Sequence, residues 1–443
     1  MTMMVMSSMM KTQTALFQAT PKKTIMTMTA SFLRSRHVFP AAVAAAAAAA
    51  PSIVVVVGGV DGATRRRSNS RSIYSSTANN TNDSKQSSSS SSLFHYNVAI
   101  TRDIPKSIIN QGITKYSKDV EPFNIDLAMK QHEDYVQVLK TLLGPNNVIR
   151  LPAIEEYPDC VFVEDTCFII HNNTNINNNN NDGNGKTIIL TNPGHPNRRG
   201  EVDTIKDVFV NNNNDLGSND NDSIIDMRDY NKDNNDADDT TDIANDIDSS
   251  SIPYCDGGDV MYTGRHLFVG ISERTNYAAI QYLSLLQQQQ QKKQNGISNF
   301  PANLPIVPVE IPKFNTQALH FKSIVTYINE STVVVPTGQL GDCIIQNMKN
   351  SFSKEALQFD YNIIRLPNIL ACNVVRVNDT ILAQDGNCKE DPSSRHILEK
   401  EIAKLNTNNN QDSNRGEQLD IIWIDNYELS KVDAALTCCS VLY

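Results

Sequence analysis

The chain has 443 residues, a formal net charge of −10 and a pI near 5.3. Because nucleic acids and anionic membranes are themselves negative, this acidic balance argues against either one as the main partner. The eight cysteines are scattered and form no CxxC pair, which disfavours zinc-finger and disulfide frameworks and favours a reducing compartment.

The first 93 residues predict a targeting-like or disordered leader and a linker. No Asp or Glu precedes Asp61, whereas Lys and Arg lie among Met, Thr, Ser and Ala, a composition typical of mitochondrial or plastid transit peptides. Prolines and glycines interrupt the apolar stretch 38–60, and a spanning helix needs about 20 predominantly apolar residues. We therefore expect a cytoplasmic protein, or an organellar one if the leader is a transit peptide, and no membrane anchor.

Three later tracts, 172–185, 211–251 and 287–295, are rich in Asn, Asp or Gln and poor in apolar residues. Such tracts cannot bury enough surface to offset their ordering entropy. Long surface loops are tolerated thermodynamically. We therefore interpret the three tracts as loop insertions within one domain that covers residues 94–443.

The rest of this domain alternates between short apolar runs and amphipathic stretches. Strands are predicted at 96–101, 147–151, 160–163, 168–170, 187–190, 363–366, 374–377 and 421–424. Paired strands are predicted at 260–269 and at 318–328 with 331–335, and helices at 126–143, 201–210 and 352–359. Recurring strand–strand–helix groups predict an α/β fold with internal pseudo-repeats.

Two charged segments occur in the first half of the domain. Asp159 precedes the predicted strand 160–163, and Glu164 and Asp165 follow it. Carboxylates at a strand end can bind a metal or a planar cation, or they are ordinary solvated acids. Arg198 follows a Pro-Gly-His-Pro turn; its guanidinium suits a carboxylate or phosphate, and the alternative is a basic surface loop.

Three further segments supply nucleophile chemistry. Asp256-Gly-Gly-Asp permits close packing of Asp256, although a hairpin turn has the same pattern. His320 is predicted in an alternating apolar strand, where a histidine is more often structural than catalytic. Cys438 and Cys439 lie in an apolar, strand-like tail, where a thiol is either a packed hydrophobe or a nucleophile. A nucleophile, a base and an orienting carboxylate are thus all available.

Together these segments resemble the dimethylarginine dimethylaminohydrolases (dimethylargininases) of the guanidino-group-modifying superfamily, in order over residues 96–443. The motifs that carry the resemblance are Phe162-Val-Glu-Asp, Arg198-Arg-Gly-Glu-Val-Asp, Asp256-Gly-Gly-Asp-Val, Leu319-His-Phe-Lys-Ser and Leu436-Thr-Cys-Cys-Ser-Val-Leu. The Cys-Cys tail resembles the eukaryotic form more than arginine deiminase. One departure is Asn192, because the family usually has an arginine before the Pro-Gly turn.

The resemblance implies a five-bladed α/β propeller (pentein) of ββαβ-type repeats. It implies hydrolysis of asymmetric dimethylarginine and monomethylarginine to citrulline and methylamines through a covalent cysteine thiouronium. Such an enzyme belongs to arginine metabolism and nitric oxide regulation. Its partner is a small-molecule methylarginine, it needs no cofactor and no metal, and zinc can bind the active-site thiol as an inhibitor. Whether the chain is a monomer or a dimer stays open.

The resemblance also assigns roles to single residues. Cys438 is the nucleophile, His320 the general acid and base, and Asp256 the partner that orients His320. The substrate-binding residues that it implies are Asp159, Glu164 and Asp165 around the guanidinium, Arg198 and Arg274 at the carboxylate, Val432 and Asp433 at the α-amino group, and Ile113 in a lid.

Two alternatives for the function remain from the sequence, and a third interpretation, a membrane-anchored protein, depends on the apolar stretch 38–60. Arginine deiminase chemistry would use the same residues on unmethylated arginine, because pocket volume is not visible in a sequence. The paired arginines for a carboxylate disfavour agmatine, which has no carboxylate. A non-catalytic binding protein on the same fold is the second alternative, although every catalytic residue type is retained.

Overall fold

The computed structural model describes residues 94–112, 122–171, 185–211, 222–231, 252–292, 300–314, 319–354, 357–384, 392–411 and 418–443. The predicted leader and Ile113 lie outside these ranges. Within them, no helix is both long enough and apolar enough to cross a membrane. The apolar stretch 38–60 also lies outside the described residues.

Five three-stranded sheets form in the described part of the chain, and all five have the same internal order. An antiparallel hairpin comes first, a helix follows, and a third strand returns parallel to the second strand of the hairpin. In one sheet the hairpin joins the two ends of the domain, because β15 (Val441–Leu442) pairs with β1 (Ala99–Arg102). These sheets confirm the predicted α/β class with internal repeats.

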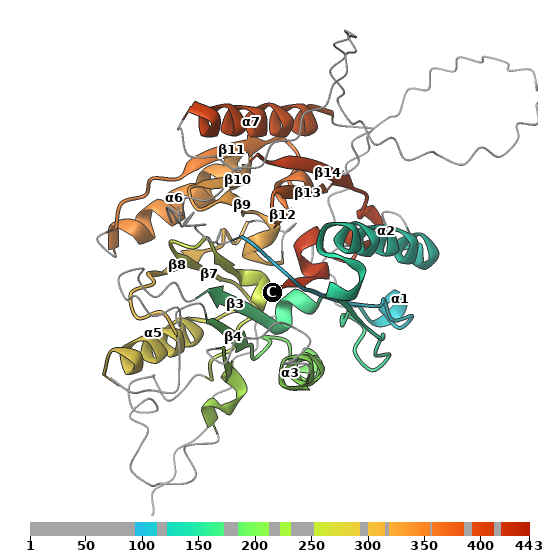
Figure 1. Ribbon diagram of the computed structural model, residues 1–443. Coiled ribbons are helices and arrows are strands. Elements are labelled where there is room, and N and C mark those ends of the chain that lie inside the picture. Colours follow the sequence, from blue (N-terminus) through green and yellow to red (C-terminus); the bar gives the residue numbers. More distant parts are fainter. Residues whose placement is uncertain are drawn as a thin grey trace, which may run out of the picture. The chain divides into compact units, whose positions relative to one another are not determined.

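The remaining strands of the sheets follow the chain. They are β2 (Val148–Leu151), β3 (Cys167–His171), β4 (Lys186–Leu190), β5 (Ser223–Asp226), β6 (Val260–Tyr262), β7 (Leu267–Ile271), β8 (Ile306–Glu310), β9 (Thr326–Asn329), β10 (Thr332–Pro336), β11 (Asn362–Leu366), β12 (Val374–Val377), β13 (Thr380–Gln384) and β14 (Asp420–Ile424). The helices that connect second and third strands are α2 (Ile125–Leu143), α3 (Glu201–Asn211), α5 (Tyr277–Lys292), α6 (Gly338–Lys354) and α7 (Pro392–Gln411). Figure 1 shows these helices around the outside of the strands, with the C-terminal end of the chain near the middle.

Apolar spacing explains why the connecting helices pack on the sheets. In α2, Ala128, Tyr135, Val136 and Leu139 are buried and occupy positions i, i+7, i+8 and i+11, so they form one face. The side chain of Asn124 accepts the backbone N–H of Leu127 and caps the first turn. The helix therefore begins where the sequence supplies both a cap and an apolar face.

A short 3₁₀ helix precedes the first strand of every sheet. These helices are η2 (Val163–Thr166), η5 (Gly257–Asp259), η6 (Phe321–Ser323), η7 (Leu370–Cys372) and η8 (Leu436–Cys439). Helix η2 contacts η5 and η8, and η5 contacts η6. Residues far apart in the chain therefore meet at equivalent positions of four of the repeats.

Three predicted elements near the site are wrong. Residues 160–163 form a turn that leads into η2, and His320 lies in a bend before η6 instead of a strand. The tail segment that holds Cys438 is the 3₁₀ helix η8, and only Val441–Leu442 is a strand. An apolar run of four residues does not distinguish a strand from a buried turn.

The predicted helix 352–359 is also displaced, because α6 ends at Lys354. Two predicted loop insertions contain regular structure. The tract 211–251 includes β5, in which Ile225 contributes to a hydrophobic core, and α5 extends into the tract 287–295. In that tract Gln287 donates to the carbonyls of Pro301 and Leu304, so a polar residue fixes the end of the helix to the next loop. Residues 172–184 lie outside the described ranges, so the interpretation of the tract 172–185 as a loop insertion stays a prediction.

Candidate active site

A narrow cavity lies where η2, η6 and η8 meet. Its lining consists of Asp159, Phe162, Asp165, Arg198, Arg274, Leu319, His320, Val432, Asp433, Ala434 and Cys438. Eight of the residues named from the sequence are therefore brought to one place. Asp256 lies directly behind His320, and Glu164 lines a different cavity.

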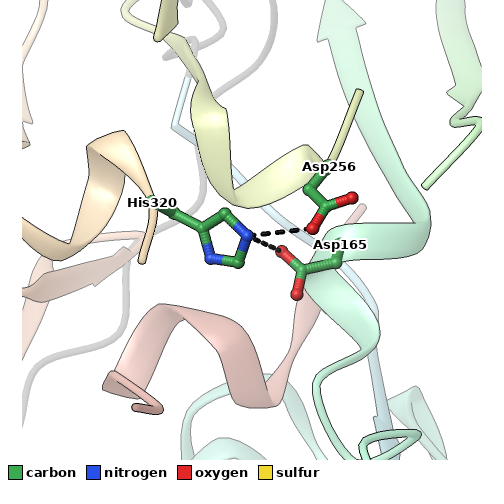
Figure 2. A group of neighbouring side chains, drawn as sticks. All are labelled: Asp165, Asp256 and His320. Carbon is green, nitrogen blue, oxygen red and sulfur yellow. Dashed lines mark hydrogen bonds and ion pairs between the residues drawn. The ribbon is translucent and has the colours of Figure 1, made fainter. Parts of the chain in front are cut away.

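His320 is held by two carboxylates from different repeats. Its Nε2 atom lies 3.0 Å from Asp256 Oδ2 and 3.8 Å from Asp165 Oδ1 (Figure 2). The other oxygen of Asp256 accepts the backbone N–H of Gly194 at 2.8 Å, which fixes the orientation of that carboxylate. All three side chains are buried, so water screens their charges little.

These carboxylates keep the histidine protonated. Burial alone lowers the pKa of His320, but Asp165, the hydrogen bond with Asp256 and the charge of Asp259 outweigh burial and raise the pKa to about 9. Burial likewise opposes ionisation of Asp165, yet the charges of His320 and Arg198 hold the pKa of this carboxyl below its usual value. At neutral pH the site therefore contains an imidazolium beside the ionised Asp165.

Close packing at Gly258 fixes the distance between the acid and the histidine. A Cβ atom at this position would lie 2.6 Å from Asp165 Oδ1 and 2.9 Å from His320 Cγ. Its backbone N–H donates to Asp165 Oδ1 at 3.0 Å. Glycine is required here because any side chain would separate Asp165 from His320.

Cys438 lies in η8 between two anchored residues. Thr437 donates from its hydroxyl to Glu164 and from its backbone N–H to Asn373, each at 2.9 Å. On the other side, the hydroxyls of Ser440 and Tyr135 lie 2.7 Å apart. Burial, with the charges of Glu164 and Asp165, raises the pKa of Cys438 well above its usual value, so its thiol is neutral without a ligand.

The neighbouring Cys439 has a different environment. Its side chain is fully buried in a hydrophobic core, and its Sγ lies 3.8 Å from the carbonyl oxygen of Ala435. Burial raises the pKa of this thiol to about 12. Of the two cysteines, Cys438 is the one that lines the cavity.

Arg274 provides a buried cationic donor at the cavity. Its side chain is only 7 % exposed, and its Nη1 atom is buried with no hydrogen-bond partner. Leaving a charged donor buried and unpaired is costly, and an anionic ligand would remove that cost. A substrate carboxylate matches this requirement.

Arg198, which the sequence analysis also assigned to the carboxylate, is engaged within the protein. Its Nε and Nη2 atoms donate to Glu201 at 3.0 and 2.6 Å, and its Nη1 atom donates to Asp165. Nη2 also donates to the carbonyls of Asp159 and Phe162. Arg198 therefore organises the acidic turn, and Arg274 is the arginine with a donor to offer.

Glu164 also differs from its predicted position beside the guanidinium. Its carboxylate forms a 2.7 Å ion pair with Lys322 and accepts the Thr437 hydroxyl. It lines a second, larger cavity together with Lys322, Thr437 and several tyrosines. The sequence did not predict this difference, because Glu164 and Asp165 are adjacent acids of one motif. Only Asp165 faces the Cys438 cavity.

Three lining residues were missed as site residues: Phe162, Leu319 and Ala434. Phe162 and Leu319 belong to the motifs that carried the resemblance, but apolar residues give no chemical signal of their own. Asp433 has a φ of 62°, an uncommon conformation for a residue with a side chain. This turn brings Val432, Asp433 and Ala434 to the cavity wall.

The same residues offer ligand atoms for a cation. One oxygen from each of Asp165 and Asp256 and a ring nitrogen of His320 lie within 4.8 Å of one another (Figure 2). The donor set of two carboxylates and an imidazole suits a divalent transition metal. The direct His320–Asp256 contact already pairs these groups, so the arrangement is complete as an oriented acid–base pair.

Sequence comparison gives two kinds of relative. The family model described as arginine deiminase matches residues 235–441. A dimethylarginine dimethylaminohydrolase from Pseudomonas aeruginosa is 24% identical over 320 residues, which cover 71% of this chain and 88% of that protein. An uncharacterized protein from Aeropyrum pernix is 23% identical over 245 residues, covering 55% of this chain and 67% of that protein.

Solved structures show the same fold. The Pseudomonas aeruginosa dimethylarginine dimethylaminohydrolase, a mutant in complex with citrulline, superposes with a TM-score of 0.51 at 21% identity, covering 79% of this chain and 100% of that one. The N-terminal domain of ArgZ, a cyanobacterial arginine dihydrolase bound to its substrate, gives a TM-score of 0.50 at 13% identity, covering 78% and 97%. These proteins support the pentein fold for this chain.

Proposed function

We propose that this chain, a dimethylarginine dimethylaminohydrolase-like member of the guanidino-group-modifying superfamily, hydrolyses Nω-methylated arginines to citrulline and a methylamine. The observation that carries this proposal is a single cavity that contains both a nucleophile with its acid–base histidine and a binding site for a carboxylate. Cys438 and the oriented His320 line it together with Arg274, whose buried Nη1 atom has no partner. A molecule with a reactive guanidinium and a carboxylate satisfies both requirements.

Charge decides how the substrate binds. Asp159 and Asp165 face the cavity and suit the guanidinium, and Arg274 suits the α-carboxylate. Val432 and Asp433 lie at the wall where the α-amino group is expected to bind. Arg198 contributes by holding Asp165 in its ionised form.

The substrate itself activates the thiol. A guanidinium beside Cys438 is a nearby positive charge, which lowers a thiol pKa and opposes the effect of burial. The thiol releases its proton to solvent, and the thiolate then attacks the guanidinium carbon and forms a C–S bond. His320 donates its proton to the methylated nitrogen, the C–N bond breaks, and the methylamine leaves.

Hydrolysis of the covalent thiouronium completes the reaction. The now neutral His320 removes a proton from water, and the hydroxide attacks the same carbon. The C–S bond breaks and the protonated urea loses its proton to solvent, which gives citrulline. The imidazolium of His320 and the thiolate of Cys438 are restored, and the thiolate takes up a proton once the product leaves. Asp256 keeps the ring oriented through both steps.

The protonation of His320 predicts the pH dependence. Since the pKa of His320 is about 9, the proton donor is present below that pH and lost above it. We expect kcat/KM to fall about tenfold per pH unit above pH 9. Measuring kcat/KM from pH 6 to 10.5, together with an NMR titration of the His320 ring in the free enzyme, checks this.

Agreement between the two midpoints supports His320 as the group whose ionisation causes the decline. A flat profile to pH 10.5, or a His320 midpoint below 7, contradicts the assigned role.

Citrulline release from asymmetric dimethylarginine, monomethylarginine and arginine tests the reaction itself. We expect turnover of both methylated substrates with kcat/KM at least about tenfold above that for arginine. Burying one carbon-sized group of the substrate contributes about 1–3 kcal/mol to transition-state binding, and arginine lacks the methyl groups. Faster turnover of arginine would indicate arginine deiminase chemistry, which the match to that family model makes the second candidate. Release from none of the three leaves a binding protein.

We further propose that the five sheets are the blades of a propeller, with Cys438 at its centre. Zinc at the Cys438 thiol is proposed as an inhibitor, and the leader 1–93 as a targeting segment. The role in nitric oxide regulation rests on the methylarginine substrate and falls with it.

A further inference from the structure

We propose that Asp259 is a positioning residue that holds the base, its orienting aspartate and the carboxylate-binding arginine in one geometry. This inference rests on the proposed function. Asp259 follows Gly257 and Gly258 as the last residue of η5, and it is fully buried. Its two carboxylate oxygens accept three hydrogen bonds, and each bond leads to a different functional residue.

The first contact fixes the histidine. Asp259 Oδ1 accepts the backbone N–H of Phe321, the residue after His320, at 2.8 Å. Gly270 permits this approach, because a Cβ atom there would lie 2.5 Å from Phe321 Cβ and 3.3 Å from Asp259 Oδ1. The start of η6 therefore cannot shift without breaking a buried bond to a carboxylate.

The second contact leads to the arginine. The Ser272 hydroxyl donates to Asp259 Oδ2 at 2.6 Å, and the same hydroxyl oxygen accepts the backbone N–H of Arg274 at 2.8 Å. Ser272 thus connects the carboxylate of Asp259 to the backbone of Arg274, whose Nη1 atom has no hydrogen-bond partner.

The third contact leads to the orienting aspartate. The Thr275 hydroxyl donates to Asp259 Oδ2 at 2.7 Å and accepts the backbone N–H of Asp256 at 3.2 Å. The backbone N–H of Asp259 also donates to the carbonyl of Asp256 at 3.0 Å. Asp256 is therefore held from two sides before it meets His320.

Asp259 also acts on the charge of the histidine. Asp165, Asp256 and Asp259 all raise the pKa of His320. The other ionisable groups that line the same cavity are Asp159, Arg198, Arg274, Asp433 and Cys438. Asp259 in turn faces His320 and Cys255. Burial raises the pKa of Asp259 to about 6, so it is ionised at neutral pH and supports the imidazolium.

Asp259→Asn tests this role, since asparagine keeps the size and can still accept from Phe321. We expect the NMR midpoint of His320 to fall by about one pH unit, because a neighbouring negative charge is removed. The alkaline limb of kcat/KM moves down with it, and kcat falls at least about tenfold. A variant with lower thermal stability but an unchanged His320 midpoint and unchanged kcat overturns the proposal.

Two milder variants separate the contacts and keep the Asp259 carboxylate. Ser272→Ala is expected to raise KM about tenfold with kcat within about twofold, and Thr275→Val to lower kcat about tenfold with KM nearly unchanged. Ser353→Ala, which removes a hydroxyl bonded to a backbone carbonyl on α6, is the matched control. Equal effects of the first two variants on kcat and KM, or effects no larger than those of the control, contradict separate positioning contacts.

The NMR titration needs no substrate, so it answers even if the chain hydrolyses none of the guanidines tested. A shifted His320 midpoint without turnover retains the positioning role and rejects the proposed function. Turnover by the parent enzyme together with an unshifted His320 midpoint in Asp259→Asn retains the proposed function and rejects the positioning role.

Discussion

Replacing Cys438 by serine is expected to lower kcat for methylarginine hydrolysis on the order of 10⁴-fold or more. Cys438 is the thiol that lines the cavity, and a serine hydroxyl has no comparable access to the ionised nucleophile. Citrulline release measures the loss, and mass spectrometry of the intact protein during turnover tests for the covalent adduct. We expect the adduct in the parent enzyme and none in Cys438→Ser.

The matched control is Cys439→Ser. Cys439 is buried in the core away from the cavity lining, so we expect kcat within about fivefold and a stability loss of about 1–3 kcal/mol, the cost of burying a hydroxyl. Titration calorimetry should still detect substrate binding to Cys438→Ser, since Asp165 and Arg274 are intact. Equal losses of activity in both variants would point to a structural role for the pair.

Much of this site could be predicted from the sequence because reactive side chains lie in short, distinctive segments. His320, Asp256 and Cys438 were each inferred from a motif, and the structure brings the three segments together. The secondary structure around them was harder to predict. Each lies in or beside a 3₁₀ helix, and such short elements have no periodicity that separates them from a strand.

Contacts between distant residues account for the other differences. Glu164 and Asp165 are adjacent in the sequence, yet Glu164 pairs with Lys322 and Asp165 with Arg198. The partner of Glu164 is more than 150 positions away and that of Asp165 more than 30, and no local sequence feature specifies either partner. The role of Asp259 was hidden for the same reason, because its three donors come from the two segments that follow it along the chain.

The two arginines first assigned to the same substrate carboxylate are expected to give opposite results. Arg198→Met should lower the free energy of unfolding by about 3–5 kcal/mol, because Asp165 and Glu201 stay buried and lose their shared cation. Arg274→Met should leave stability within about 1 kcal/mol and raise KM about 10- to 100-fold, the loss of a charge-assisted hydrogen bond of about 1.5–3 kcal/mol. Urea unfolding and steady-state kinetics on both variants measure these effects.

A second substitution, at Glu201, tests whether Arg198 stabilises the protein by neutralising buried carboxylates. Burial raises the pKa of Glu201 to about 7 even with Arg198 present, so this carboxylate is the one that protonates most readily when its partner is lost. Adding Glu201→Gln to Arg198→Met should therefore recover part of the lost stability. If Arg198→Met instead unfolds like the parent and only KM rises, Arg198 binds the substrate carboxylate directly. The buried ion pairs would then be incidental to its role.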